Sequence, residues 1–173
     1  VVFPMGMAAK QEATVTSPSG NLTLTAGVDK AGRPYYSLSR GKEAILLPSY
    51  LGVKLKDGSL DSDFGVMGFV RATKDETWHQ PWGEENDVRN HYNELTMKLA
   101  QRKGLKRQLT IVFRVFDDGM GFRYVFPEQK NLKHFVIMDE ETEFCFKGDP
   151  EAWTLPYDAD YYEGLWTKAP LSK

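Results

Sequence analysis

Hydrophobic and polar residues alternate along much of the chain, and this period of two is typical of half-buried β-strands. Residues 21–25 (NLTLT) and 34–39 (PYYSLS) alternate in this way on either side of a turn signal at 29–32 (DKAG). Together they predict a β-hairpin. Two shorter strands are expected next, at residues 43–47, ending before Pro48, and at residues 52–56.

The clearest strands are expected in the second half of the chain. Residues 92–99 (YNELTMKL) and 108–116 (QLTIVFRVF) alternate strongly, and the tight turn 117–119 (DDG) leads into a third strand at 121–126. Two shorter strands are expected at 134–138 and 142–147. Because no long segment has a helical period and turn signals recur regularly, the sequence predicts an all-β fold, a large antiparallel sandwich.

Residues 57–90 interrupt this alternation. They are rich in Gly, Asp, Asn, Trp and Pro and show no sustained period. We therefore expect a long irregular loop here. Long loops on β-sheet frameworks often carry function, which makes this segment a candidate site.

The charge balance limits the choice of partners. The 173 residues include 22 basic and 24 acidic side chains, interspersed along the chain, for a net charge of −2. Such a chain has no strong field to attract nucleic acid. No apolar run reaches the roughly 18 residues of a membrane span. Neither a nucleic-acid partner nor a membrane span is expected.

The N-terminal residues indicate the cellular location, and the single cysteine limits the covalent cross-links. Residues 1–9 (VVFPMGMAA) are apolar and end in small residues, as the end of a secretory signal peptide does. We expect residues 1–10 to be a signal remnant or disordered, residues 11–173 to form one domain, and the protein to be periplasmic or secreted. Cys145, the only cysteine, excludes an internal disulfide and is expected to fill part of the core.

Three motifs in series resemble the N-terminal domain of glycoside hydrolase family 97. They are residues 78–85 (WHQPWGEE), 88–95 (VRNHYNEL) and 113–124 (FRVFDDGMGFRY), and the match runs from about residue 12 to the C-terminal end. The resemblance implies a β-super-sandwich related to mutarotase-like domains. In full-length members it implies a (β/α)8 catalytic barrel after this domain, which the present chain lacks.

The same resemblance implies a function for the full-length protein. Members are similar to exported, calcium-dependent, exo-acting enzymes that hydrolyse α-linked glucose or galactose saccharides, with their catalytic carboxylates on the barrel. We expect this chain to pack on its own barrel domain and to be non-catalytic alone. The 78–85 motif and the strand after it look more like the α-glucosidase branch than the α-galactosidase branch.

The motif at residues 78–85 is the candidate substrate-binding site. Trp78 and Trp82 could stack on a sugar ring, while His79 and Glu84 could bond its hydroxyl groups. The alternative is that the two tryptophans anchor the long loop on the sandwich. The residues themselves leave both interpretations open.

The segment 157–166 (YDADYYEGLW) is the candidate metal site. Asp158, Asp160 and Glu163 offer the oxygen ligands that calcium prefers, although the spacing by itself favours a solvated acidic loop, because it is not an EF-hand pattern. The resemblance implies that Glu163 crosses to the barrel and ligates calcium in the full-length enzyme only. The aromatic residues around it are expected to form an exposed docking patch: Trp153, Tyr157, Tyr161, Tyr162 and Trp166.

The remaining charged residues favour structural roles. We expect Arg89 and His91 to pair with carboxylates at the base of the loop, and the charges around residues 117–119 (Arg114, Asp117, Asp118 and Arg123) to pair across strands. Two other functions stay open. One is an independent carbohydrate-binding module; the other is a free-standing mutarotase-like enzyme, for which the three scattered histidines are poor candidates.

Overall fold

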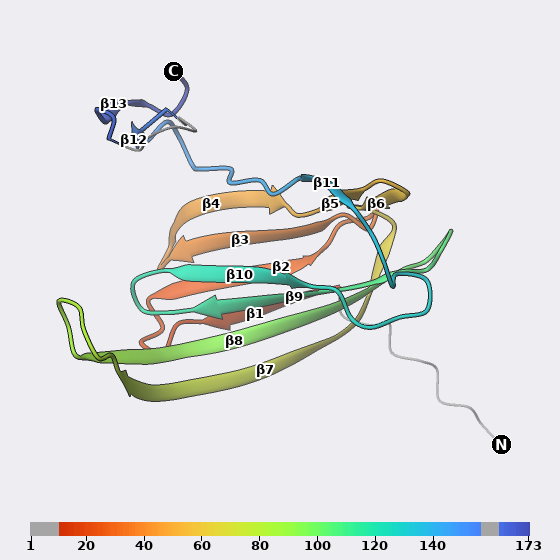
Figure 1. Cartoon of the computed structure of the whole chain (residues 1–173), viewed down its shortest axis with the longest axis horizontal. Helices are drawn as coiled ribbons and strands as arrows, with labels where there is room; N and C mark the ends of the chain where they lie inside the picture. The colour runs from red at the N-terminus through yellow and green to blue at the C-terminus, as the bar shows by residue number, and fades with distance from the viewer. Residues whose placement is uncertain (1–10, 157–162) are drawn as a thin grey trace.

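In the computed structural model, which describes residues 11–156 and 163–173, all regular secondary structure is β (Figure 1). The predicted all-β antiparallel fold is confirmed. The strands are β1 (Glu12–Thr16), β2 (Leu22–Val28), β3 (Pro34–Arg40), β4 (Glu43–Tyr50), β5 (Val53–Leu55), β6 (Gly58–Leu60), β7 (Phe64–His79), β8 (Asp87–Gln101), β9 (Gln108–Val115), β10 (Met120–Val125), β11 (Ile137–Glu140), β12 (Glu151–Thr154) and β13 (Thr167–Pro170).

Two four-stranded sheets form the sandwich. The first sheet has the order β1-β2-β3-β4 and the second has the order β10-β9-β8-β7, so each strand pairs with its neighbour in sequence. Two small sheets, β11-β5-β6 and β12-β13, complete the described fold. Figure 1 shows β12 and β13 set apart from the two large sheets, on the side of β4.

The core lies between the inner faces of the two large sheets. In β2 the alternate residues Leu22 and Leu24 are fully buried, and in β9 so are Ile111 and Phe113. Tyr36 of β3 joins the sheets, because its ring centroid lies 6.1 Å from that of Phe113. Its hydroxyl donates a hydrogen bond of 2.9 Å to the carbonyl oxygen of residue 143, which satisfies the buried polar group.

The prediction of a long irregular loop at residues 57–90 is wrong. Strands β7 and β8 pair from Phe64↔Gln101 to His79↔Asp87, so the segment is mostly one long hairpin (Figure 1). Beyond Val70 every residue of β7 is exposed. Alternation in a sequence arises where one face of a strand is buried, and this half of β7 has no buried face to produce it.

Two further differences concern strand ends. β4 continues through Pro48 to Tyr50, which an edge strand of a sheet tolerates. The strand expected at 134–138 begins only at Ile137, and the one expected at 142–147 forms a single bridge between Phe146 and Leu46.

Two segments that carry predictions lie outside the described residues. The expected signal remnant at residues 1–10 lies outside them, as do Tyr157, Asp158, Asp160, Tyr161 and Tyr162. Within residues 11–156 and 163–173 there is no helix long and apolar enough to cross a membrane.

Candidate functional site

The tip of the β7–β8 hairpin carries the four predicted substrate-binding residues. The strand pairs end at His79↔Asp87, and the backbone N–H of Gln80 donates a 2.9 Å hydrogen bond to the carbonyl of Asn86, closing the loop 80–86. Trp82 is 84% exposed at this tip, and Trp78 is half exposed. This exposure disfavours the alternative in which the tryptophans anchor a loop on the sandwich.

The four side chains do not share one surface. Successive residues of a strand point to opposite faces of a sheet, so Trp78 and His79 diverge. His79 Nδ1 lies 3.1 Å from Asp87 Oδ1, across the hairpin. Glu84 is exposed within the loop. The arrangement therefore offers two exposed indole rings, Trp78 and Trp82, while His79 is already engaged with a carboxylate.

A charge cluster lies on the hairpin close to its tip, and in it Arg89 and His91 lie beside a carboxylate, as predicted. Arg89 Nε and Nη2 each donate a hydrogen bond of 2.8 Å to the Asp75 carboxylate. His91 Nε2 lies 3.9 Å from the same carboxylate. The hydrogen bond from Arg89 lowers the pKa of Asp75, which keeps the carboxylate charged. These residues have a structural role in the hairpin.

The charges near the β9–β10 turn pair differently from the prediction. Arg114 Nε donates a 2.9 Å hydrogen bond to Glu94 on β8, not to an aspartate of the turn. Asp117 accepts a 2.8 Å hydrogen bond from the backbone of Ser19. Arg123 forms no ion pair with any described residue. The sequence could not show this, because the strand order places β8 rather than the turn beside Arg114.

Glu163 lies exposed just before β13, in an irregular stretch. Its carboxylate makes no hydrogen bond or ion pair with the other residues that the structure describes, and among those residues no group of three His, Cys, Asp or Glu could hold a metal ion. Calcium takes six to eight oxygen ligands. The described residues therefore do not form a calcium site by themselves, and Glu163 could supply one carboxylate to a site completed elsewhere.

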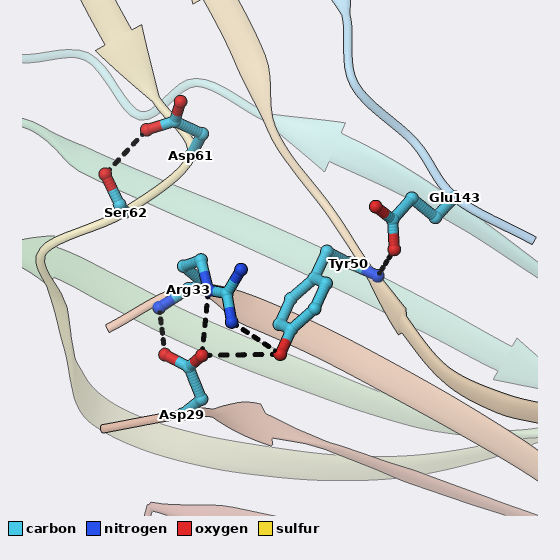
Figure 2. Close-up of polar contacts among 6 residues, drawn as sticks. All are labelled: Asp29, Arg33, Tyr50, Asp61, Ser62 and Glu143. Carbon is cyan, nitrogen blue, oxygen red and sulfur yellow. Dashed lines mark hydrogen bonds and ion pairs between the residues drawn. The ribbon is translucent and has the colours of Figure 1, made fainter. Parts of the chain in front are cut away.

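A polar groove at the end of β4 was not foreseen from the sequence (Figure 2). The Arg33 guanidinium lies over the Tyr50 ring, 3.9 Å from its centroid, and donates to the Tyr50 hydroxyl at 2.7 Å. Its Nε donates to Asp29 at 2.8 Å. Glu143 accepts a 2.9 Å hydrogen bond from the Tyr50 backbone. These contacts tie the β2–β3 turn and residue 143 to the end of β4.

The electrostatics of the groove agree with a structural role. Burial would raise the pKa of Asp29, but hydrogen bonds from the Arg33 backbone and side chain outweigh it and lower the pKa overall. The one arginine of the groove is thus neutralised within the network. A groove of about 290 Å³ remains above it, with Asp61 and Ser62 on one wall and Glu143 on another.

The described fold defines the class of the chain as an antiparallel β-sandwich domain. A family model described as "Glycosyl-hydrolase 97 N-terminal" matches residues 15–173, and the chain belongs to this family. The resemblance inferred from the three motifs is confirmed.

Curated relatives are much longer than this chain. It is 28% identical to the retaining alpha-galactosidase of Bacteroides thetaiotaomicron over 186 residues, which is 100% of this chain and 26% of that protein. It is 26% identical to a probable retaining alpha-galactosidase of Streptomyces bingchenggensis, over 91% of this chain and 23% of that protein. The chain thus spans about a quarter of the length of the curated relatives it matches.

Solved structures agree with the fold. A glycoside hydrolase family 97 enzyme from Pseudoalteromonas sp. strain K8, solved in complex with panose and with acarbose, is 31% identical and superposes with a TM-score of 0.86, covering 92% of this chain and 24% of that one. A beta-arabinopyranosidase, 24% identical with a TM-score of 0.78, covering 90% of this chain and 26% of that one, shares the fold.

Proposed function

We propose that this chain is the non-catalytic N-terminal domain of an exported exo-α-glycosidase and packs on a (β/α)8 barrel that carries the catalytic carboxylates. The observation that carries the proposal is the family match over residues 15–173 to a model named for an N-terminal part, together with relatives about four times as long. Glycoside hydrolysis requires two carboxyl groups that flank the scissile bond. In this proposal both come from the barrel.

The substrate we propose is an α-linked glucose saccharide in preference to an α-linked galactose saccharide. The 31% identity to the enzyme solved with panose and acarbose supports it. The names of the curated relatives, at 28% and 26% identity, support the galactoside instead. The kcat/KM of the full-length protein for p-nitrophenyl α-glucoside and α-galactoside separates the two, and this chain alone should hydrolyse neither.

The hairpin tip is proposed to contact the saccharide through Trp78 and Trp82, with His79 and Glu84 at its edge. These proposed contacts are supported by the solvent exposure of both indole rings at the end of a paired hairpin. Stacking of an indole ring on the apolar face of a sugar ring stabilises binding by burying aromatic surface. In the full-length protein Trp82→Ala should raise KM with little change in kcat, whereas Leu105→Ala, at an exposed apolar residue between β8 and β9, should change neither.

Calcium is proposed to be bound only in the full-length enzyme, with Glu163 as one ligand. The support is an exposed carboxylate that has no partner among the described residues and lies within the range that the family model matches. A bound ion would hold the sugar and ease departure of the leaving group. Glu163→Gln in the full-length protein should weaken the dependence of activity on calcium and leave the thermal melting of this domain unchanged. Unchanged activity and calcium dependence would remove Glu163 from the site.

Exposed tryptophans also favour a second candidate, an independent carbohydrate-binding module. Retardation of this chain alone in gels that contain an α-glucan would support the module. Export to the periplasm or the medium remains part of the main proposal, and cell fractionation of the full-length protein tests it.

A further inference from the structure

The outer face of the second sheet has a small buried cluster of its own. Tyr92 on β8 is 4% exposed and Val112 on β9 is 7% exposed, although both point away from the first sheet and neither belongs to the main core. The Arg114 guanidinium covers the Tyr92 ring at 4.5 Å, and the Phe116 ring lies 5.3 Å from it. This face therefore has an apolar floor beneath a charged side chain.

A hollow opens beside this floor because β10 has a glycine there. Gly121 pairs with Arg114, so a side chain at position 121 would stand next to that guanidinium on the outer face. A Cβ placed on Gly121 meets no atom within 4 Å, and its φ is not positive. The backbone thus does not require glycine here, and the missing side chain leaves space. The hollow has a volume of about 200 Å³ and is lined by Val112, Arg114, Phe116, Gly121, Phe122 and Arg123.

The polar side-chain groups of the hollow are hydrogen-bond donors, and most of them have no acceptor among the described residues. Arg114 uses its Nε on Glu94, and its two terminal nitrogens bond to no described residue. Arg123 is exposed and makes no hydrogen bond or ion pair within the described part of the chain. A guanidinium has no acceptor atoms. The residues that line the hollow carry two guanidinium groups and no carboxylate, so the hollow suits a ligand that supplies acceptor atoms and negative charge.

We propose that this hollow binds a single sugar unit that bears a carboxylate, a hexuronate. Guanidinium groups bind carboxylates through paired, charge-assisted hydrogen bonds. The carboxylate of the sugar would therefore bind Arg114 and Arg123. The Phe116 ring, which lines the hollow, supplies an aromatic surface for the apolar face of the sugar ring. The volume is below the roughly 300–1,000 Å³ of sites for drug-sized ligands, which limits the ligand to about one ring. This acidic ligand differs from the neutral α-glycosides of the proposed function.

The test is a titration of this chain with glucuronate and galacturonate, followed by amide chemical shifts. Binding with a Kd on the order of 1 mM is expected for one charged ring, with the shifts concentrated on β9 and β10. Arg123→Met removes the free guanidinium and Gly121→Leu fills the hollow; each should weaken binding at least tenfold. Thermal melting confirms that both variants are folded.

Matched controls exist for both substitutions. Arg40→Met removes an exposed arginine at the end of β3, and Gly68→Leu adds a side chain on β7 where a Cβ also meets nothing within 4 Å. Both should bind hexuronate as the wild type does. Equal shifts with glucose, equal shifts with acetate, or hexuronate binding that survives Gly121→Leu would each overturn the proposal. Hydrolysis of neutral α-glycosides by the full-length protein is measured separately, so the proposed function can fail without this site failing.

Discussion

Arg107 is the charged residue that is buried within the described part of the chain, and it depends on specific partners. It forms an ion pair with Asp57, and its Nε donates a 3.3 Å hydrogen bond to the carbonyl of Asn131. A buried charge is tolerated when it is paired and hydrogen-bonded. The pair therefore joins the β5–β6 turn and the segment at residue 131 to the start of β9.

The ion pair predicts a pH-dependent contribution of Asp57 to stability. The hydrogen bond from Arg107 lowers the pKa of Asp57 below its ordinary value of 3.8. A lowered carboxyl pKa stabilises the folded state above the unfolded pKa, and this contribution is lost as the pH falls through the folded pKa. The difference in free energy of unfolding between the wild type and Asp57→Asn should be constant from about pH 7 to pH 5 and shrink below about pH 4.

Urea denaturation of both proteins at a series of pH values measures this difference. The other carboxyls with lowered pKa values, such as Asp75 and Asp117, are present in both proteins and cancel. A difference that stays unchanged down to pH 2 would show that the ion pair does not set the pKa of Asp57.

Among the elements, strands with one buried face were predictable and strands without one were not. Residues 34–39 and 108–116 alternate because Tyr36 and Phe113 face the core while their neighbours do not. The outer half of β7 has no core contact, so its sequence is free of any period. The candidate tip residues were found from their chemistry, whereas the hollow at Gly121 depends on the pairing of β10 with β9, which no local pattern reveals.

The position of the core predicts that the hairpin tip is dispensable for folding. Replacing residues 78–88 with Asn-Gly keeps the pair Thr77↔Arg89 and closes it with a two-residue turn. None of the removed residues belongs to the core, so the free energy of unfolding should change by less than about 1 kcal/mol. Met97→Ala in the core part of β8, where the side chain is fully buried, should cost about 2–5 kcal/mol.

Denaturant unfolding of the two variants makes the comparison. If the shortened hairpin were as destabilised as Met97→Ala, the outer half of β7 and β8 would have to support the core, contrary to the burial pattern.

For the whole molecule, the C-terminal β12–β13 hairpin predicts self-association of the isolated chain. Trp153 and Trp166 are 63% and 61% exposed, and Leu165 is more exposed still. Exposed apolar patches favour association. Light scattering should show an average mass that rises with concentration, and the double substitution of Trp153 and Trp166 by serine should restore a monomer. A strict monomer at high concentration for the wild type would contradict the expected docking patch.

The consecutive strand order of each large sheet also bears on how the chain folds during synthesis. Every pairing in the first sheet joins neighbours in sequence and is complete once residue 50 has left the ribosome, so these pairings close short loops at low entropic cost. The apolar side of that sheet, including Leu24 and Tyr36, is covered only when the strands of the second sheet are made, beginning with β7. Between completion of the first sheet and synthesis of the second, the nascent polypeptide exposes an apolar sheet surface. During this interval it is most dependent on chaperones.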